Sequence, residues 1–287
     1  MPQTINTNLV SLNAQRNLTG SQGALATSMQ RLSSGLRVNS AKDDAAGLAI
    51  AERMNAQIRG MNVAARNAND RISMAQVAEG ALSKVGDALQ RMRELAVQAR
   101  NATNSSSDKD SLDKEFGELA KEIQRVLGGT TFNGKVILGA NAGTQTFQIG
   151  ANTTTDDSID IITDNLQSNA TITVIAGTDN TGSARGTINS AADTTTIATV
   201  INNIDDAIDL VNNTRATFGA TQSRFDAIVA NLMVSAENQT AARSRIMDAD
   251  FAAETAAMSR AQILQQAGNA MVAQANQLPQ QVLKLLG

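Results

Sequence analysis

Two patterns in this sequence could do chemistry, and the first resembles a phosphate-binding loop. Gly129, Gly134 and Lys135 match the start of the G-x-x-x-x-G-K-[ST] pattern, whose backbone and lysine bind nucleotide phosphates. Val136 follows, so the hydroxyl group that would bind Mg²⁺ is missing. The segment also leads from a helical pattern into a hairpin pattern, whereas a nucleotide loop leads from a strand into a helix. A β-turn is therefore the favoured interpretation.

The second pattern is a group of aspartates that could bind Ca²⁺, because hard cations prefer clustered carboxylate oxygens. They are Asp156, Asp157, Asp160 and Asp164. Their spacing is not that of an EF-hand, so a solvated acidic surface is favoured. The chain contains no His and no Cys, which excludes a thiolate nucleophile, a histidine base, a disulfide and the usual zinc sites. We therefore predict no catalytic residue, metal or cofactor, and a protein that is not an enzyme.

Composition also limits the partners of the chain. A net charge of −3 gives no basic face, so we expect no binding to nucleic acid. The N-terminal sequence MPQTINTNLVSLN lacks the basic stretch and apolar run of a secretory signal peptide. The uncharged run 261–283 is interrupted throughout by Gln and Asn, which indicates an amphipathic helix and no membrane insertion.

Both ends of the chain carry apolar residues at seven-residue spacing. This spacing keeps an apolar stripe on one side of a helix, so each end needs a partner to cover its stripe. We predict a terminal-helix assembly surface from these residues: Leu18, Leu25, Met29, Leu32, Leu36, Leu264, Met271, Leu278, Val282 and Leu285. In the C-terminal segment, a second row of small residues runs beside the large ones through Ala261, Gly268, Ala275 and Val282.

Between the ends, the sequence predicts three further helices. A capping sequence at 39–44 starts the second helix near Asp43. Its apolar row is Met54, Met61, Ala68, Ala75, Leu82, Leu89 and Ala96. A third helix follows from about residue 111 and should fold back antiparallel on the second. A fourth helix from Ile197 repeats every seven residues over many turns, which is typical of coiled-coil packing.

Strand patterns are confined to the middle of the chain. Asn133-Gly134 predicts a β-hairpin turn within 131–138, and strand-like runs follow at 146–149, 158–162 and 170–175. From 141 to 196 the composition shifts to small polar residues, which favours an exposed, weakly packed region.

These patterns together predict a mainly α fold of nested long antiparallel helices with coiled-coil-like packing, a β-hairpin and a small β-rich outer region. The expected domains are an inner terminal-helix domain of 1–44 plus 248–287, a helical core domain with the β-hairpin of 45–140 plus 195–247, and a short variable surface-exposed region of 141–194.

Several longer motifs carry a family resemblance. They include INTNLVSLNAQRNL, QRLSSGLRVNSAKDDAAGLAIAERM, NANDRISMAQVAEGAL, ENQTAARSRIMDADFAAET and ILQQAGNAMVAQANQLPQQVL. Through these motifs the chain closely resembles bacterial flagellin, the subunit of the flagellar filament. The resemblance covers about residues 3–140 and 195–287, and the middle of the chain lies outside it.

The resemblance implies a structural protein that self-assembles into a helical homopolymer used for swimming motility. It also implies export of the unfolded subunit through the flagellar type III channel and an extracellular location in the filament. The implied partners are hook-filament junction proteins, a filament cap and an export chaperone at the C-terminal segment. Because the terminal stripes bury little apolar surface in a lone subunit, we expect the ends to be disordered there and ordered in the filament.

The resemblance further implies recognition by the vertebrate Toll-like receptor for flagellin. The residues that match the receptor-binding pattern are Gln90, Arg91, Arg93, Glu94, Leu95, Gln98 and Glu115. Without the resemblance, the charged members of this set would be interpreted as a solvated helix face with local ion pairs.

Three alternatives remain open at this stage. A hook-filament junction protein has similar helical ends but acts in few copies and does not form long filaments alone. An enzyme could be carried in the central insertion, although the missing His argues against a zinc protease there. A cytoplasmic coiled-coil scaffold would have no requirement for export.

Overall fold

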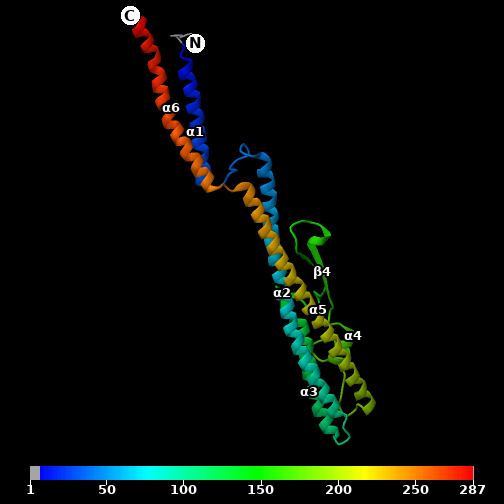
Figure 1. The fold of residues 1–287 in the computed structure, drawn as a ribbon. Helices are drawn as coiled ribbons and strands as arrows, with labels where there is room; N and C mark the ends of the chain where they lie inside the picture. Colours follow the sequence, from blue (N-terminus) through cyan, green and yellow to red (C-terminus); the bar gives the residue numbers. More distant parts are fainter. Residues whose placement is uncertain (1–6, 287) are drawn as a thin grey trace. The chain divides into compact units, whose positions relative to one another are not determined.

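The computed structural model describes residues 7–286, with the backbone alone for 278–286. It forms two compact units, one of Met1–Ala56 with Glu237–Gly287 and one of Gln57–Ala236. The division lies inside the two longest helices, α2 (Ala45–Ala99) and α5 (Thr194–Met247), and not at the positions 44 and 248 used for the expected domains. The mainly α fold with long antiparallel helices that the sequence predicted is confirmed (Figure 1).

The first unit contains α1 (Leu9–Ser34) and α6 (Phe251–Leu286), which lie side by side (Figure 1). Their contacts join residue 8 to 275 and residue 31 to 254, so the two helices are antiparallel. The side chain of Asn8 caps α1 by accepting the Ser11 N–H, and Gly35 ends the helix at φ 73°, a conformation that favours glycine.

A short connection follows α1 and leads into α2. Leu36 forms a β-bridge with Asp248, and a small cluster buries Val38, Ala51 and Met247. Asp44 accepts the Gly47 N–H through its side chain, as a helix cap does, and α2 begins at Ala45. The predicted helix start near Asp43 is therefore confirmed to within two residues.

The second unit is built on the remaining parts of α2 and α5, with α3 (Ser106–Gly129) beside α2 (Figure 1). The predicted row of α2 is buried from Met61 to Ala96, and each member is at most 7% exposed. Ser105 and Asp108 form a reciprocal capping box at the start of α3. The ion pairs Arg91–Glu115 and Arg93–Asp205 place α3 and α5 on either side of α2.

Two small antiparallel hairpins belong to the second unit. The first pairs β1 (Thr131–Phe132) with β2 (Lys135–Val136), and its turn residues Asn133 and Gly134 have φ of 48° and 77°. Both values are positive, as a type I′ turn requires, so the predicted β-turn is confirmed. The second hairpin pairs β3 (Gly143–Gln148) with β4 (Ser158–Thr163), with a short 3₁₀ turn at Thr155–Asp157 between them.

The third predicted strand, 170–175, is wrong because this segment forms the helix α4 (Ala170–Ala176). Its β-branched residues suggested a strand, but Asn169 caps the first turn by accepting the Thr171 N–H. Ile172, Ile175 and Ala176 then fall on one helical face and are buried. Leu166 and Ile188 enter the same core, so 141–194 is better packed than its polar composition suggested.

No helix in the described part of the chain combines the length and the apolar character that crossing a membrane needs.

Candidate functional site

The terminal helix pair α1 and α6 packs through leucines against small residues. Leu18 and Leu25 on α1 are half-buried, whereas Ala261 and Ala275 on α6 are almost fully buried. Gly268 lies between those alanines, and a Cβ atom added to it would stand 3.1 Å from Leu18 Cδ1. The absent side chain of Gly268 therefore permits the close approach of the two helices at this point.

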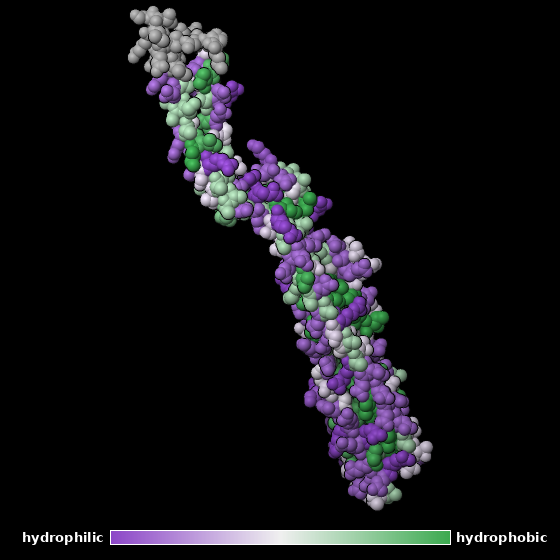
Figure 2. All heavy atoms as spheres, in the orientation of Figure 1, coloured by the Kyte–Doolittle hydropathy of each residue, from purple (hydrophilic) through white to green (hydrophobic). Residues whose placement is uncertain are grey.

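The large apolar residues of α6 remain outside this contact. Leu264 is 51% exposed and Met271 is 59% exposed, although both line the edge of a groove between α1 and α6. Figure 2 shows hydrophobic atoms among hydrophilic ones on the visible face of the α1 and α6 pair. In the part of α6 whose side chains are described, the small row packs on α1. Leu264 and Met271 of the large row stay more than half exposed and form the outward row.

The predicted assembly residues also differ in how exposed their side chains are. Leu18, Leu25, Leu32 and Leu36 are half-buried, whereas Met29 on α1 is 53% exposed. Leu278, Val282 and Leu285 lie in the last part of α6, outside the residues whose side chains the structure describes. Further apolar side chains that the seven-residue spacing did not predict are exposed on the two helices: Leu9, Val10, Leu12, Phe251 and Ile263.

Polar contacts fix the register of α1 against α6. Arg31 Nη1 donates to Glu254 Oε1 at 2.9 Å, and these side chains are 30% and 14% exposed. The hydrogen bond from Arg31 lowers the pKa of the Glu254 carboxyl, which keeps the pair charged at neutral pH. At the other end, Asn8 Nδ2 donates to the Ala275 carbonyl at 2.7 Å, and Ser11 Oγ bonds Asn276 at 2.7 Å.

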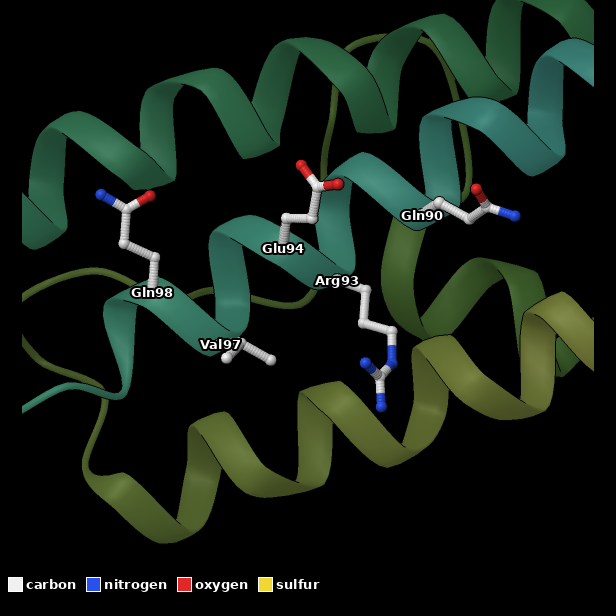
Figure 3. Close-up of a pocket in the computed structure, with 5 residues that line it drawn as sticks. All are labelled: Gln90, Arg93, Glu94, Val97 and Gln98. Carbon is white, nitrogen blue, oxygen red and sulfur yellow. The ribbon is translucent and has the colours of Figure 1, made fainter.

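Six of the seven residues that the resemblance assigned to receptor recognition are exposed, five on α2 and one on α3. Arg91 bonds both Glu94 and Glu115 at 2.9 Å. Arg93 donates to both carboxylate oxygens of Asp205, from Nε to Oδ1 at 2.6 Å and from Nη2 to Oδ2 at 3.3 Å. Figure 3 shows Arg93 directed toward α5, whereas Glu94 and Gln98 point away from it. A groove along α2 is lined by Gln90, Arg93, Glu94, Val97 and Gln98.

Leu95 differs from the other members of this set. It is 1% exposed and belongs to the hydrophobic core of the second unit, whereas the other six residues are exposed. Leu95 therefore supports the surface from beneath.

The two patterns that could do chemistry have structural roles in the folded chain. The phosphate-loop resemblance falls on the turn between β1 and β2, which follows the helix α3. In the aspartate group, Asp157 bonds Thr154 and Asp160 bonds Thr146. Across residues 7–286, no three His, Cys, Asp or Glu side chains gather in a way that could hold a metal ion.

Comparison with known proteins connects this architecture to a family. The sequence matches the bacterial flagellin N-terminal helical region over residues 5–146 and the bacterial flagellin C-terminal helical region over residues 201–286. It is 44% identical over 282 residues to the flagellin of Halalkalibacterium halodurans, covering 98% of this chain and 99% of the relative. It is 41% identical over 305 residues to the flagellin of Bacillus subtilis, again covering 98% and 99%.

A solved structure, the crystal structure of Bacillus cereus flagellin, is 31% identical and has a TM-score of 0.47, covering 62% of this chain and 94% of the other. The family resemblance expected from the motifs is confirmed by the sequence matches, which extend over both helical regions and nearly the full length of the relatives. The chain belongs to the bacterial flagellin family, whose members are subunits of the flagellar filament.

Proposed function

We propose that this chain builds a swimming filament by self-assembly through its terminal helices, after export in the unfolded state by the flagellar type III system. The observation that carries the proposal is the outward row of α6. Leu264 and Met271 remain more than half exposed while the small residues beside them pack on α1. A repeated apolar row on a helix that already has one partner needs another copy to cover it.

In the proposed filament, each of the expected domains occupies its own layer. Residues 1–44 and 248–287 form the inner layer of the filament, and 45–140 with 195–247 form the surrounding helical layer. Residues 141–194 lie outermost and can vary. The ends order on assembly, because neighbouring subunits supply the apolar surface that offsets the entropy of ordering them.

The role is structural and extracellular, and no residue acts as a catalyst. The partners are other copies of the chain, the filament cap, hook-filament junction proteins and an export chaperone that holds the C-terminal segment.

Seeded growth tests the proposed function. Purified chain added to filament fragments should elongate them into long filaments visible by electron microscopy, and amide exchange in the ends should slow on assembly. A chain trimmed to 45–247 should not elongate the same seeds. Normal growth of the trimmed chain, or intact protein that stays monodisperse in every polymerising condition, would contradict the proposal. A junction protein would bind the seeds without forming long filaments.

The exposed surface of α2 supports a second proposal, recognition of released subunits by the host Toll-like receptor. Arg91→Ala combined with Glu115→Ala removes the ion pair at the centre of this surface. Because arginine is often an energetic centre of protein interfaces, the response of receptor-bearing cells to monomer should fall by about tenfold or more. Leu95 is left intact, since its truncation would disturb the core.

A matched control is available on α3. Arg125 and Glu122 form an exposed ion pair of the same chemistry at 2.6 Å. Their double alanine variant should retain the full cell response. An unaltered response to the Arg91 and Glu115 variant, with both variants equally folded by circular dichroism, would argue against receptor binding at this surface.

A further inference from the structure

A single arginine interrupts the buried apolar face of α2. Beside the predicted row runs a second seven-residue row, in which Ala64, Ala78, Val85 and Met92 are all at most 1% exposed. Arg71 occupies the position between Ala64 and Ala78 and is itself only 1% exposed. A cation therefore stands where the packing pattern of the helix places apolar groups.

The guanidinium of Arg71 has aromatic neighbours but no acceptor. Its Cζ lies 5.3 Å from the ring centroid of Phe147 and 5.4 Å from that of Phe218. None of its three nitrogens, Nε, Nη1 and Nη2, has a hydrogen-bond partner among the residues that the structure describes. Burial lowers the pKa of Arg71 to about 10, so the group is still charged at neutral pH.

The energetic balance at this position is unfavourable. Contacts with two rings return part of the cost of removing a cation from water. The rest of this desolvation cost is not offset. An ion that is buried without hydrogen-bonding partners loses its hydration and forms no hydrogen bonds in its place. The closed arrangement around Arg71 is therefore less stable than the same arrangement around an uncharged side chain of similar length.

The element that closes over Arg71 is the β3–β4 hairpin. Phe147 on β3 meets Phe225 of α5 edge to face, with centroids 5.9 Å apart, and Ile159 and Ile161 on β4 pack in the same small cluster. One polar anchor is added by Asn67 Nδ2, which donates to the Gln148 carbonyl at 3.1 Å. A two-stranded hairpin is marginal without such packing, so its closure depends on this cluster, and Phe147 at the edge of the cluster lies beside the charge of Arg71.

The base of the hairpin is attached to the main core. Just after β4, Leu166 N–H donates to the Leu138 carbonyl at 3.0 Å. Leu166 itself is fully buried in the main core. Movement at the far end can therefore occur while the base of the hairpin and the α2–α5 packing persist.

We infer that Arg71 makes the β3–β4 hairpin a releasable flap. In the open state Phe147 leaves the guanidinium, Arg71 becomes hydrated, and α2 and α5 stay paired. The buried cation sets the closed state only slightly below the open one in free energy. This opening of the hairpin is a property of the folded subunit, so the inference does not depend on the proposed self-assembly.

Amide hydrogen exchange on Arg71→Met tests the inference. Methionine has a similar length and no charge, so the closed hairpin should be stabilised, and exchange at β3 and β4 should slow by about tenfold or more. Amides of α4 should be unchanged. Arg71→Lys retains a cation and should exchange like the parent chain. Arg66→Met, a neutralisation at an exposed position of the same helix, should also leave the hairpin unchanged.

Three outcomes would overturn the inference. Unchanged exchange at the hairpin in Arg71→Met would show that the charge does not oppose closure. Faster exchange would show that Arg71 is a clamp that holds the hairpin through its aromatic contacts. Arg71→Leu is the second neutral variant, and if both neutral variants fail to fold, the arginine is a stabilising residue and the releasable flap is rejected.

Discussion

Replacing Leu264 and Met271 together by glutamate should abolish filament growth while leaving the stability of the second compact unit unchanged. Both residues are more than half exposed on α6 in the lone chain, so the substitutions disturb little there. In the proposed polymer a neighbouring copy covers them. Because each parent side chain is already about half buried, covering the rest would contribute about 1 kcal/mol, and each unpaired carboxylate would instead cost several kcal/mol.

The measurement is the rate of elongation from filament seeds, followed by light scattering and checked by electron microscopy. From these energies the rate or final yield should fall by at least about a hundredfold. Gln266→Glu with Asn269→Glu is the matched control, because it adds the same two charges at exposed polar positions of the same helix. The control should still elongate. Parent-like elongation of the Leu264 and Met271 variant would remove the outward row from the assembly surface.

The sequence predicted the long helices well because their packing is periodic and local. The row of α2 from Met61 to Ala96 is buried throughout, as the seven-residue spacing required. The start of α2 and the turn at Asn133-Gly134 also follow from local side-chain chemistry. Such features depend on neighbours a few residues away, and single-sequence patterns record those neighbours directly.

The terminal pair shows what periodicity leaves undetermined. Both rows of α6 repeat every seven residues, so spacing alone did not say which row would face α1. The choice depends on how closely two helices can approach, and Gly268 against Leu18 settles it in favour of the small row. The assembly role of the large row stays a prediction.

Features that depend on distant partners were missed. The α4 segment was predicted as a strand, because β-branched residues outweighed the Asn169 cap in the pattern. The aromatic neighbours of Arg71 were not predicted, since Phe147 and Phe218 lie far away in the sequence. The same holds for Asp113 and Arg185, whose pairing crosses from α3 to the loop before α5. Only the tertiary fold brings these groups together.

Asp113→Ala is expected to be among the most destabilising single substitutions in the second unit. The carboxylate holds Arg185 at 3.0 and 2.7 Å through both oxygens and accepts the Ile188 N–H at 2.8 Å. The side chains of Arg185 and Asp113 are only 16% and 13% exposed. Alanine would leave a largely buried cation without its carboxylate partner and the Ile188 N–H without an acceptor, which costs about 3–5 kcal/mol.

Urea unfolding followed by far-ultraviolet circular dichroism measures this loss in the free energy of unfolding. Glu122→Ala breaks the exposed ion pair with Arg125 on the same helix and should cost less than about 1 kcal/mol. Asp113→Leu combined with Arg185→Met should recover part of the loss, because removing both charges leaves no unpaired ion. If Asp113→Ala lowers the free energy of unfolding no more than Glu122→Ala does, the ion pair of Asp113 with Arg185 does not anchor the loop before α5. If the double variant is as unstable as the single one, the lost Ile188 contact dominates, and Asp113 then acts mainly as a backbone acceptor.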